Sequence, residues 1–255
     1  MSSRVATPAS SSFTALLRYG KSNALTMKPA WSRTSTGFLP QVSANARAVA
    51  SVSSLVVIES IVEDLPTKKH LFSELDRIVA DGGILATNTS TLPVVEMAME
   101  TQKADKVCGV HFFNPAPMMS LVEIVRPITA SDETIAEVRG FAEACGKSPV
   151  EVKDRAGFIV NALLFPYLNN AVRMLENGTA TRDDIDTAMK GGCGFPMGPL
   201  ALLDLVGLDT SLAILDALYA EFRDPNYAAV PLLRRMVAAE LYGRKSGQGF
   251  FDYRK

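Results

Sequence analysis

The spacing of hydrophobic residues predicts strands and helices that alternate from Leu55 to Asp154. Short unbroken apolar runs indicate buried strands, and stretches whose apolar residues recur every three or four positions indicate helices. Strands are expected over 55–59, 84–88, 107–113, 121–125 and 150–152, and helices over 65–80, 93–99 and 132–145. Ser131 precedes the last helix as an N-cap. This alternation predicts an α/β layer around a largely parallel sheet.

The pattern changes after Asp154, where only helical periodicity continues. Helices are expected over 157–175, after the capping residue Thr181, from Pro199 through 218, and over 232–241. We therefore place a domain boundary near Asp154. It separates an α/β part, residues 55–154, from an all-helical part, residues 155–255.

The first 54 residues differ from the rest in composition. The first acidic residue of the chain is Glu59, whereas Arg and Lys occur throughout the segment together with many Ser, Thr and Ala residues. A basic, hydroxylated and acid-free start is typical of a transit peptide. Residues 1–54 are thus expected to be a leader, either a transit peptide or a disordered segment outside the core. The transit-peptide interpretation implies a mitochondrial or plastid location, and the other implies a cytoplasmic one.

The overall composition excludes several functional classes. A formal net charge of −1 offers no electrostatic basis for nucleic-acid binding. No apolar run approaches the roughly 20 residues that a membrane-spanning helix needs. The three cysteines are isolated and lack metal-ligand spacing, so they are expected to be buried thiols. We expect no nucleic-acid partner, no membrane span and no metal.

His111 and Glu123 are the residues that most directly indicate chemistry. His111 lies near the end of one expected strand, Glu123 lies inside the next, and the Pro-rich segment 113–120 can continue neither. Two strands joined in this way can bring the carboxylate beside the imidazole. Such a carboxylate fixes the tautomer and stabilises the protonated ring, as a general base requires. A structural core histidine is the alternative.

The segment HFFNPAPMMSLVE, residues 111–123, resembles the 3-hydroxyacyl-CoA dehydrogenase family, as does GFIVN at 157–161. The resemblance extends from Leu55 to Lys255. It implies an incomplete Rossmann-like parallel sheet followed by a helical domain for substrate binding and dimerisation. It also implies NAD as cofactor, an acyl-CoA substrate and a homodimer formed through the helical domain. His111 then takes the proton of the 3-hydroxyl group, and Glu123 orients His111.

The resemblance gives roles to six further residues. Ser90 would contact substrate and nicotinamide, with an N-cap as its structural alternative, and Asn161 would bind substrate near the reacting carbon from the middle of its helix. The remaining four match cofactor-contacting positions, although solvated charges are the simpler explanation for the first two: Glu63, Lys68, Asn114 and Lys245. His70 is expected at the surface.

The chain departs from this family at its start. The glycine-rich turn that would hold the NAD pyrophosphate is not found among residues 1–54, whose only glycines are Gly20 and Gly37, with no expected strand before either. The first strand, 55–59, would then have an open edge. Three functions stay open: a short-chain, 3-hydroxybutyryl-CoA type dehydrogenase, a truncated paralogue acting as a dimerisation or regulatory subunit, and a related β-hydroxyacid dehydrogenase.

Overall fold

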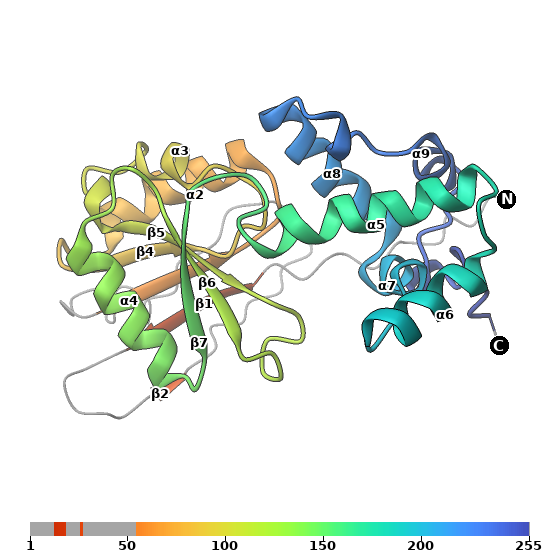
Figure 1. The fold of residues 1–255 in the computed structure, drawn as a ribbon. Helices are drawn as coiled ribbons and strands as arrows, with labels where there is room; N and C mark the ends of the chain where they lie inside the picture. Colours follow the sequence, from red (N-terminus) through yellow and green to blue (C-terminus); the bar gives the residue numbers. More distant parts are fainter. Residues whose placement is uncertain (1–12, 19–25, 28–54, 255) are drawn as a thin grey trace, which may run out of the picture. The chain divides into compact units, whose positions relative to one another are not determined.

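A computed structural model describes residues 13–18, 26–27 and 55–254. The chain divides into two compact units, Met1–Arg155 and Ala156–Lys255 (Figure 1). The first contains the β-sheet with its helices, and the second contains helices and short turns.

The sheet of the first unit has the strand order β2-β1-β3-β4-β5-β6-β7. Parallel pairing joins β3 to β4, β4 to β5 and β6 to β7, whereas β6 runs antiparallel to β5. The antiparallel step follows from the short link at 113–120, because a parallel connection would need a crossover of a dozen or more residues. The five strands of this series are Leu55–Ser60 (β3), Ile84–Thr87 (β4), Val107–Phe112 (β5), Leu121–Arg126 (β6) and Ser148–Lys153 (β7).

The expectation of an open edge at β3 was wrong. Strand β1, Phe13–Arg18, pairs antiparallel with β3 along its whole length, and β2, Thr26–Met27, pairs with β1. A strand therefore does precede Gly20. Its backbone groups satisfy the edge of β3 that would otherwise remain unpaired. The rest of the expected leader, including Gly20 and Gly37, lies outside the described residues.

The two faces of the sheet carry different side chains, since neighbouring residues of a strand point to opposite sides. One face carries the buried apolar side chains of β3 to β6. It packs against α4, Asp132–Ala144, through a core of Ile135, Val138 and Phe141 with the strand residues Val56, Ile58, Ile84, Ala86, Cys108, Val110, Val122 and Ile124. As expected, Ser131 caps α4 and accepts a hydrogen bond from the N–H of Thr134.

The opposite face carries the alternate strand residues, and four of these are buried polar side chains. Three of them lie at the ends of strands: Glu59 in β3, Thr87 in β4 and His111 in β5. The fourth, Glu123, lies in β6. The helices α2, Leu65–Ile78, and α3, Val94–Ala98, belong to the same side. A β-carbon at Gly109 would lie only 3.2 Å from Val94 Cγ2 and 2.7 Å from Val125 Cβ, so glycine permits the close approach of α3.

Residues 156–254 of the second unit form five α-helices and two 3-10 turns around one apolar core. We expected one helix from Pro199 through 218, but the chain breaks at Gly207, whose φ of 101° is open mainly to glycine. Separate helices therefore pack on either side of the break, as Figure 1 shows. The helices are Val160–Glu176 (α5), Arg182–Cys193 (α6), Pro199–Val206 (α7), Leu208–Phe222 (α8) and Pro231–Ala238 (α9).

Candidate active site

The structure confirms that His111 and Glu123 lie together. They are direct partners in the antiparallel register of β5 and β6, so their side chains leave the same face of the sheet. The distance from His111 Nδ1 to Glu123 Oε2 is 2.7 Å. Glu123 is fully buried and His111 is 5% exposed. In such a setting the charge of one group acts strongly on the other, because little water screens it.

This pairing determines which ring nitrogen can act as a base. An ionised carboxylate only accepts hydrogen bonds, so Nδ1 carries the hydrogen and Nε2 is the accepting nitrogen of the neutral ring. Ser90 Oγ lies 3.1 Å from Nε2 and can donate to it. The ring of Phe113 packs against the imidazole at a centroid distance of 4.6 Å. The imidazole is thus held on two sides, with Nε2 directed toward a hydroxyl group.

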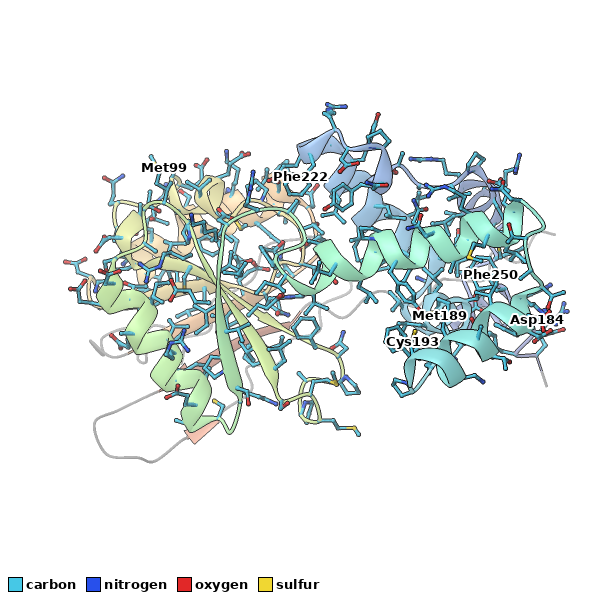
Figure 2. The ribbon with its side chains drawn as sticks, viewed as in Figure 1. Met99, Asp184, Met189, Cys193, Phe222 and Phe250 are labelled. Atoms are coloured by element: carbon cyan, nitrogen blue, oxygen red, sulfur yellow. The ribbon has the colours of Figure 1, made fainter. Side chains whose placement is uncertain are left out.

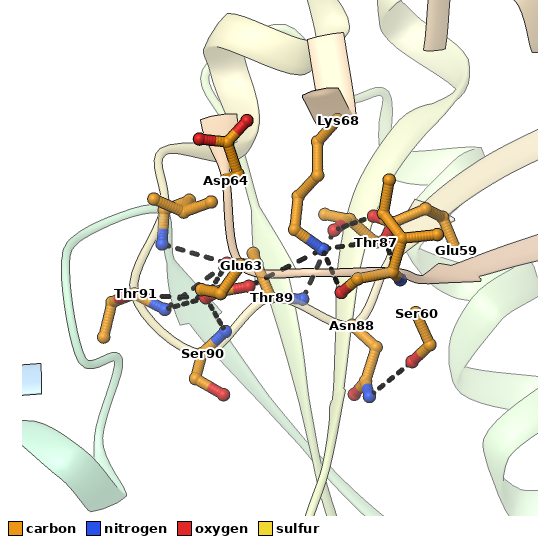
Figure 3. A network of polar contacts seen from close by, with 12 residues as sticks. Glu59, Ser60, Glu63, Asp64, Lys68, Thr87, Asn88, Thr89, Ser90 and Thr91 are labelled. Atoms are coloured by element: carbon orange, nitrogen blue, oxygen red, sulfur yellow. Dashed lines mark hydrogen bonds and ion pairs between the residues drawn. The ribbon is translucent and has the colours of Figure 1, made fainter. Parts of the chain in front are cut away.

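The loop that carries Ser90 is organised by Glu63. One carboxylate oxygen, Glu63 Oε1, accepts hydrogen bonds from Thr89 Oγ1 at 2.6 Å, the N–H of Ser90 at 2.8 Å and the N–H of Thr91 at 3.2 Å (Figure 3). Glu63 lies in the connection between β3 and α2, and Ser90 in the connection between β4 and α3. Both connections lie at the carboxyl ends of parallel strands, where open α/β sheets bind ligands.

Asn88, which directly follows β4, connects the ends of three strands by hydrogen bonds. Its Nδ2 donates to Ser60 Oγ at 2.8 Å, and its Oδ1 accepts the N–H of Phe112 at 2.8 Å. The ends of β3, β4 and β5 are therefore tied together next to the histidine. The sequence pattern predicted Asn88 only as the last residue of a strand.

Lys68 shows that the simpler explanation for one predicted cofactor residue was wrong. Its side chain is only 1% exposed, not solvated, and its ammonium group lies 2.7 Å from Glu59 Oε1 and 3.5 Å from Glu63 Oε2 (Figure 3). Glu63 keeps 39% of its side chain exposed. Sequence reasoning missed Glu59, which is fully buried. The available signal was an acid at the end of an apolar strand, where a charge needs a partner.

Asn161 and Lys245 belong to the second unit. Asn161 lies in the first turn of α5 because the helix begins at Val160, so the expected mid-helix position is corrected, and its side chain is buried. Lys245 lies in the short 3-10 turn Arg244–Ser246 and forms an ion pair with Asp209 of α8. The approach of Asn161 to the reacting carbon and the contact of Lys245 with NAD stay predictions.

The structure also describes Asn114, His70 and the three cysteines. Asn114 is exposed two residues after the end of β5, and its peptide bond to Pro115 is cis. His70 is exposed on α2, as expected. Of the cysteines, Cys108 is buried, Cys145 is partly buried, and Cys193 is exposed at the end of α6 (Figure 2), which corrects the expectation that all three are buried. Burial raises the pKa of the Cys108 thiol to about 12, so Cys108 is no nucleophile.

Other site types are not found in the described part of the chain. No group of three or more His, Cys, Asp or Glu side chains there could hold a metal ion. Among the same residues, no helix combines the length and hydrophobicity needed to cross a bilayer.

The residues at the strand ends fit the reacting end of a dinucleotide better than its phosphates. Serine, glutamate and lysine side chains can hydrogen-bond the polar groups of a nicotinamide nucleotide. A pyrophosphate instead needs a glycine-rich turn at a helix N-terminus. The two described strand-to-helix connections at this edge, 61–64 and 88–93, contain no glycine. The described residues thus account for the nicotinamide end alone.

Two family models match the chain. The 3-hydroxyacyl-CoA dehydrogenase NAD binding domain matches residues 15–155, and the 3-hydroxyacyl-CoA dehydrogenase C-terminal domain matches residues 157–253. The first match begins at residue 15, within the expected leader, so the family likeness extends beyond the expected start at residue 55.

Named relatives and solved structures agree with the models. A 3-hydroxybutyryl-CoA dehydrogenase of Mycobacterium tuberculosis is 48% identical over 200 residues, covering 78% of this chain and 70% of the relative. The mitochondrial hydroxyacyl-coenzyme A dehydrogenase of Sus scrofa is 44% identical over 218 residues, covering 85% and 69%. The crystal structure of (S)-3-hydroxybutyryl-CoA dehydrogenase from Ralstonia eutropha superposes with a TM-score of 0.79 at 42% identity, covering 82% of this chain and 73% of that one.

Proposed function

Because the chain belongs to the 3-hydroxyacyl-CoA dehydrogenase family, it is an oxidoreductase with NAD as its cofactor, and we propose that it interconverts short-chain 3-hydroxyacyl-CoA and 3-oxoacyl-CoA. The observation that carries this proposal is the buried pair of His111 and Glu123 with the hydroxyl of Ser90 at His111 Nε2. The relatives named for 3-hydroxybutyryl-CoA support a four-carbon acyl group, as used in fatty acid β-oxidation.

His111 is the proposed general base. Its Nε2 accepts the proton of the substrate's 3-hydroxyl group as the C–O bond gains double-bond character. Bound NAD supplies the hydride acceptor for the hydrogen on the same carbon. Glu123 stabilises the imidazolium ring that results, since it is a buried carboxylate 2.7 Å from Nδ1. In the reverse direction His111 returns the proton to the carbonyl oxygen.

The other proposed roles concern positioning. Ser90 supplies a hydroxyl beside Nε2 and can orient the reacting oxygen. Asn161 is proposed to donate a hydrogen bond to that oxygen. Four residues are proposed to contact NAD, with Glu63 and Lys68 supported by their place at the strand ends: Glu63, Lys68, Asn114 and Lys245.

The decisive experiment replaces His111 with glutamine. We expect His111→Gln to lower kcat for acetoacetyl-CoA reduction by NADH about 10²–10⁴-fold, which is the usual contribution of general acid–base catalysis. The matched control is His70→Gln, because His70 is the other histidine of the chain and lies exposed on α2. Turnover of His111→Gln equal to that of the parent contradicts the assignment. The alternative function, a related β-hydroxyacid dehydrogenase, is tested by comparing turnover of 3-hydroxyacyl-CoA substrates with turnover of free hydroxy acids.

A regulatory or dimerisation subunit is the second candidate. The observation that favours it is the lack of glycine in the two described strand-to-helix connections, 61–64 and 88–93, because a pyrophosphate is normally held by a glycine-rich turn at a helix N-terminus. Titration with NADH, followed by nicotinamide fluorescence, separates the two candidates. Saturable binding supports the dehydrogenase, whereas a folded parent that binds no NADH supports the subunit.

Dimerisation and location are proposed on separate grounds. Exposed apolar side chains on the helices of the second unit support a homodimer through this unit: Leu163 and Met174 of α5 and Leu205 of α7. Light scattering that finds only monomer contradicts it.

The mitochondrial relatives of human and pig support an organellar location, together with the acid-free start. A fluorescent fusion of residues 1–54 that stays in the cytosol contradicts that location.

A further inference from the structure

Glu59 is a fully buried carboxylate at the carboxyl end of β3, and the proposed mechanism does not use it. Its Oε1 accepts the N–H of Ile61 at 2.6 Å and the ammonium of Lys68 at 2.7 Å. Its Oε2 accepts the hydroxyl of Thr87, the last residue of β4, at 2.8 Å. The carboxylate therefore joins the ends of two parallel strands to the first turn of α2.

Lys68 connects Glu59 to Glu63 because its ammonium group contacts both carboxylates. The ammonium lies between the carboxylates of Glu59 and Glu63, at 2.7 Å and 3.5 Å, and 3.4 Å from the carbonyl oxygen of Ile61. An ammonium that is 1% exposed has little water to move toward, so its position depends on Glu59. Glu63 uses one oxygen for Lys68 and the other for the Ser90 loop (Figure 3).

Ser90 is the point at which two polar networks meet. Its hydroxyl contacts His111 Nε2, in the network that contains Glu123. Its N–H donates to Glu63 Oε1, in the network that contains Lys68 and Glu59. A change at Glu59 can therefore reach the imidazole through Lys68, Glu63 and Ser90.

Buried ion pairs of this kind often contribute little net stability. Desolvation of two charges offsets most of their attraction, and apolar residues of similar volume often replace buried pairs without loss. Rigid support for reacting groups is a different benefit, because a displacement of 1 Å can abolish a productive geometry. The pair lies between two strand ends and the loop that carries Ser90, where such support is useful.

We propose that Glu59 is a positioning residue for the reaction: through Lys68 and Glu63 it holds the Ser90 loop so that the serine hydroxyl meets His111 Nε2. This inference rests on the proposed function for its catalytic meaning, but the contact itself can be measured without turnover. The chain contains only two histidines, so the imidazole nitrogen resonances of His111 can be followed by NMR with exposed His70 as internal reference.

The experiment uses the full chain without cofactor or substrate. Ser90→Ala removes the hydroxyl and defines the direction in which the Nε2 resonance of His111 moves. Glu59→Gln leaves the Lys68 ammonium buried beside one exposed carboxylate, so it lowers Tm and moves the resonance in the same direction. The double variant Glu59→Gln/Lys68→Met removes both buried charges. It is expected to regain most of the lost Tm while the resonance stays displaced.

The matched control is Asp76→Asn/Lys103→Met, a second pair on the same unit. Asp76 lies near the other end of α2, with side-chain exposures of 12% for Asp76 and 11% for Lys103. This control is expected to lower Tm and leave the His111 resonance in place. A double variant at Glu59 and Lys68 with the resonance of the parent overturns the proposal, as does Ser90→Ala without any displacement. Failure of the proposed function would appear separately, as a parent that reduces no acetoacetyl-CoA.

Discussion

Glu123 lies directly opposite His111 in the register of β5 and β6, and its carboxylate oxygen lies 2.7 Å from the imidazole Nδ1 across the strands. The pair therefore depends on backbone pairing, not on a flexible loop. A shift of this register by one residue would turn Glu123 to the opposite face, against α4. The sheet itself thus holds the proposed base and its carboxylate together.

Loss of the carboxylate at this position should impair turnover more than folding. We expect Glu123→Gln to lower kcat about 10²-fold, since a neutral amide cannot stabilise the imidazolium ring. KM should change little because Glu123 is fully buried beneath His111. Steady-state kinetics with acetoacetyl-CoA, with thermal unfolding beside it, checks this. A variant with the kcat of the parent would exclude the proposed role of Glu123.

Asn169 should be a major contributor to the stability of the second unit. This buried amide of α5 donates to the carbonyl oxygens of Asn226 and Ala228 and accepts the N–H of Val230. Asn169→Ala leaves these backbone groups without their partner, so we expect the free energy of unfolding to fall by about 2–4 kcal/mol. Denaturant titration measures it. The control is the exposed neighbour Asn170→Ala, and equal effects of the two variants would contradict the prediction.

Asp204 should make the stability of the protein fall as the pH rises. Burial raises the pKa of its carboxyl above the ordinary value, although the N–H groups of Phe251 and Phe250 and the hydroxyl of Tyr253 lower it in part. The folded chain thus holds this proton at a higher pH than the unfolded chain. Its contribution to stability is lost between the ordinary carboxyl pKa of about 4 and the raised folded value.

The comparison of the parent with Asp204→Asn isolates this titration. The free energy of unfolding of the parent minus that of the variant should be larger at about pH 4 than at about pH 7. Asp252→Asn is the control with the opposite sign, because hydrogen bonds with Arg254 lower the pKa of Asp252 to about 2. The free energy of unfolding of the parent minus that of Asp252→Asn should become smaller as the pH falls. An Asp204 difference that grows toward neutral pH contradicts the prediction.

The cysteines should differ sharply in their reaction with iodoacetamide. The pKa of Cys108, about 12, leaves roughly 10⁻⁴ of the thiol ionised at pH 8, and the residue is fully buried. Cys193 is exposed at the end of α6. Peptide mass analysis should find Cys193 alkylated in the native protein and Cys108 alkylated only after unfolding in urea. Early modification of Cys108 would show that β5 opens readily.

Most helix and strand positions could be predicted because their signals are local. Apolar runs, the cap at Ser131 and the break after Asp154 involve residues close in sequence, and the structure has elements at each expected place. The break at Gly207 was missed because helical periodicity continues across it, and only the packing of α7 and α8 requires a positive φ there. The first strand was missed because the pairing of β1 with β3 joins residues about 40 positions apart.

The alternating layer, the helical second half and the pair His111 and Glu123 could be predicted from the sequence because each follows from patterns within a short window. The burial of Lys68 and its pairing with Glu59 became visible in the folded chain. A lysine near a helix start looks solvated in sequence. Its exposure depends on which strand ends and loops fold over it, and those contacts come from distant parts of the chain.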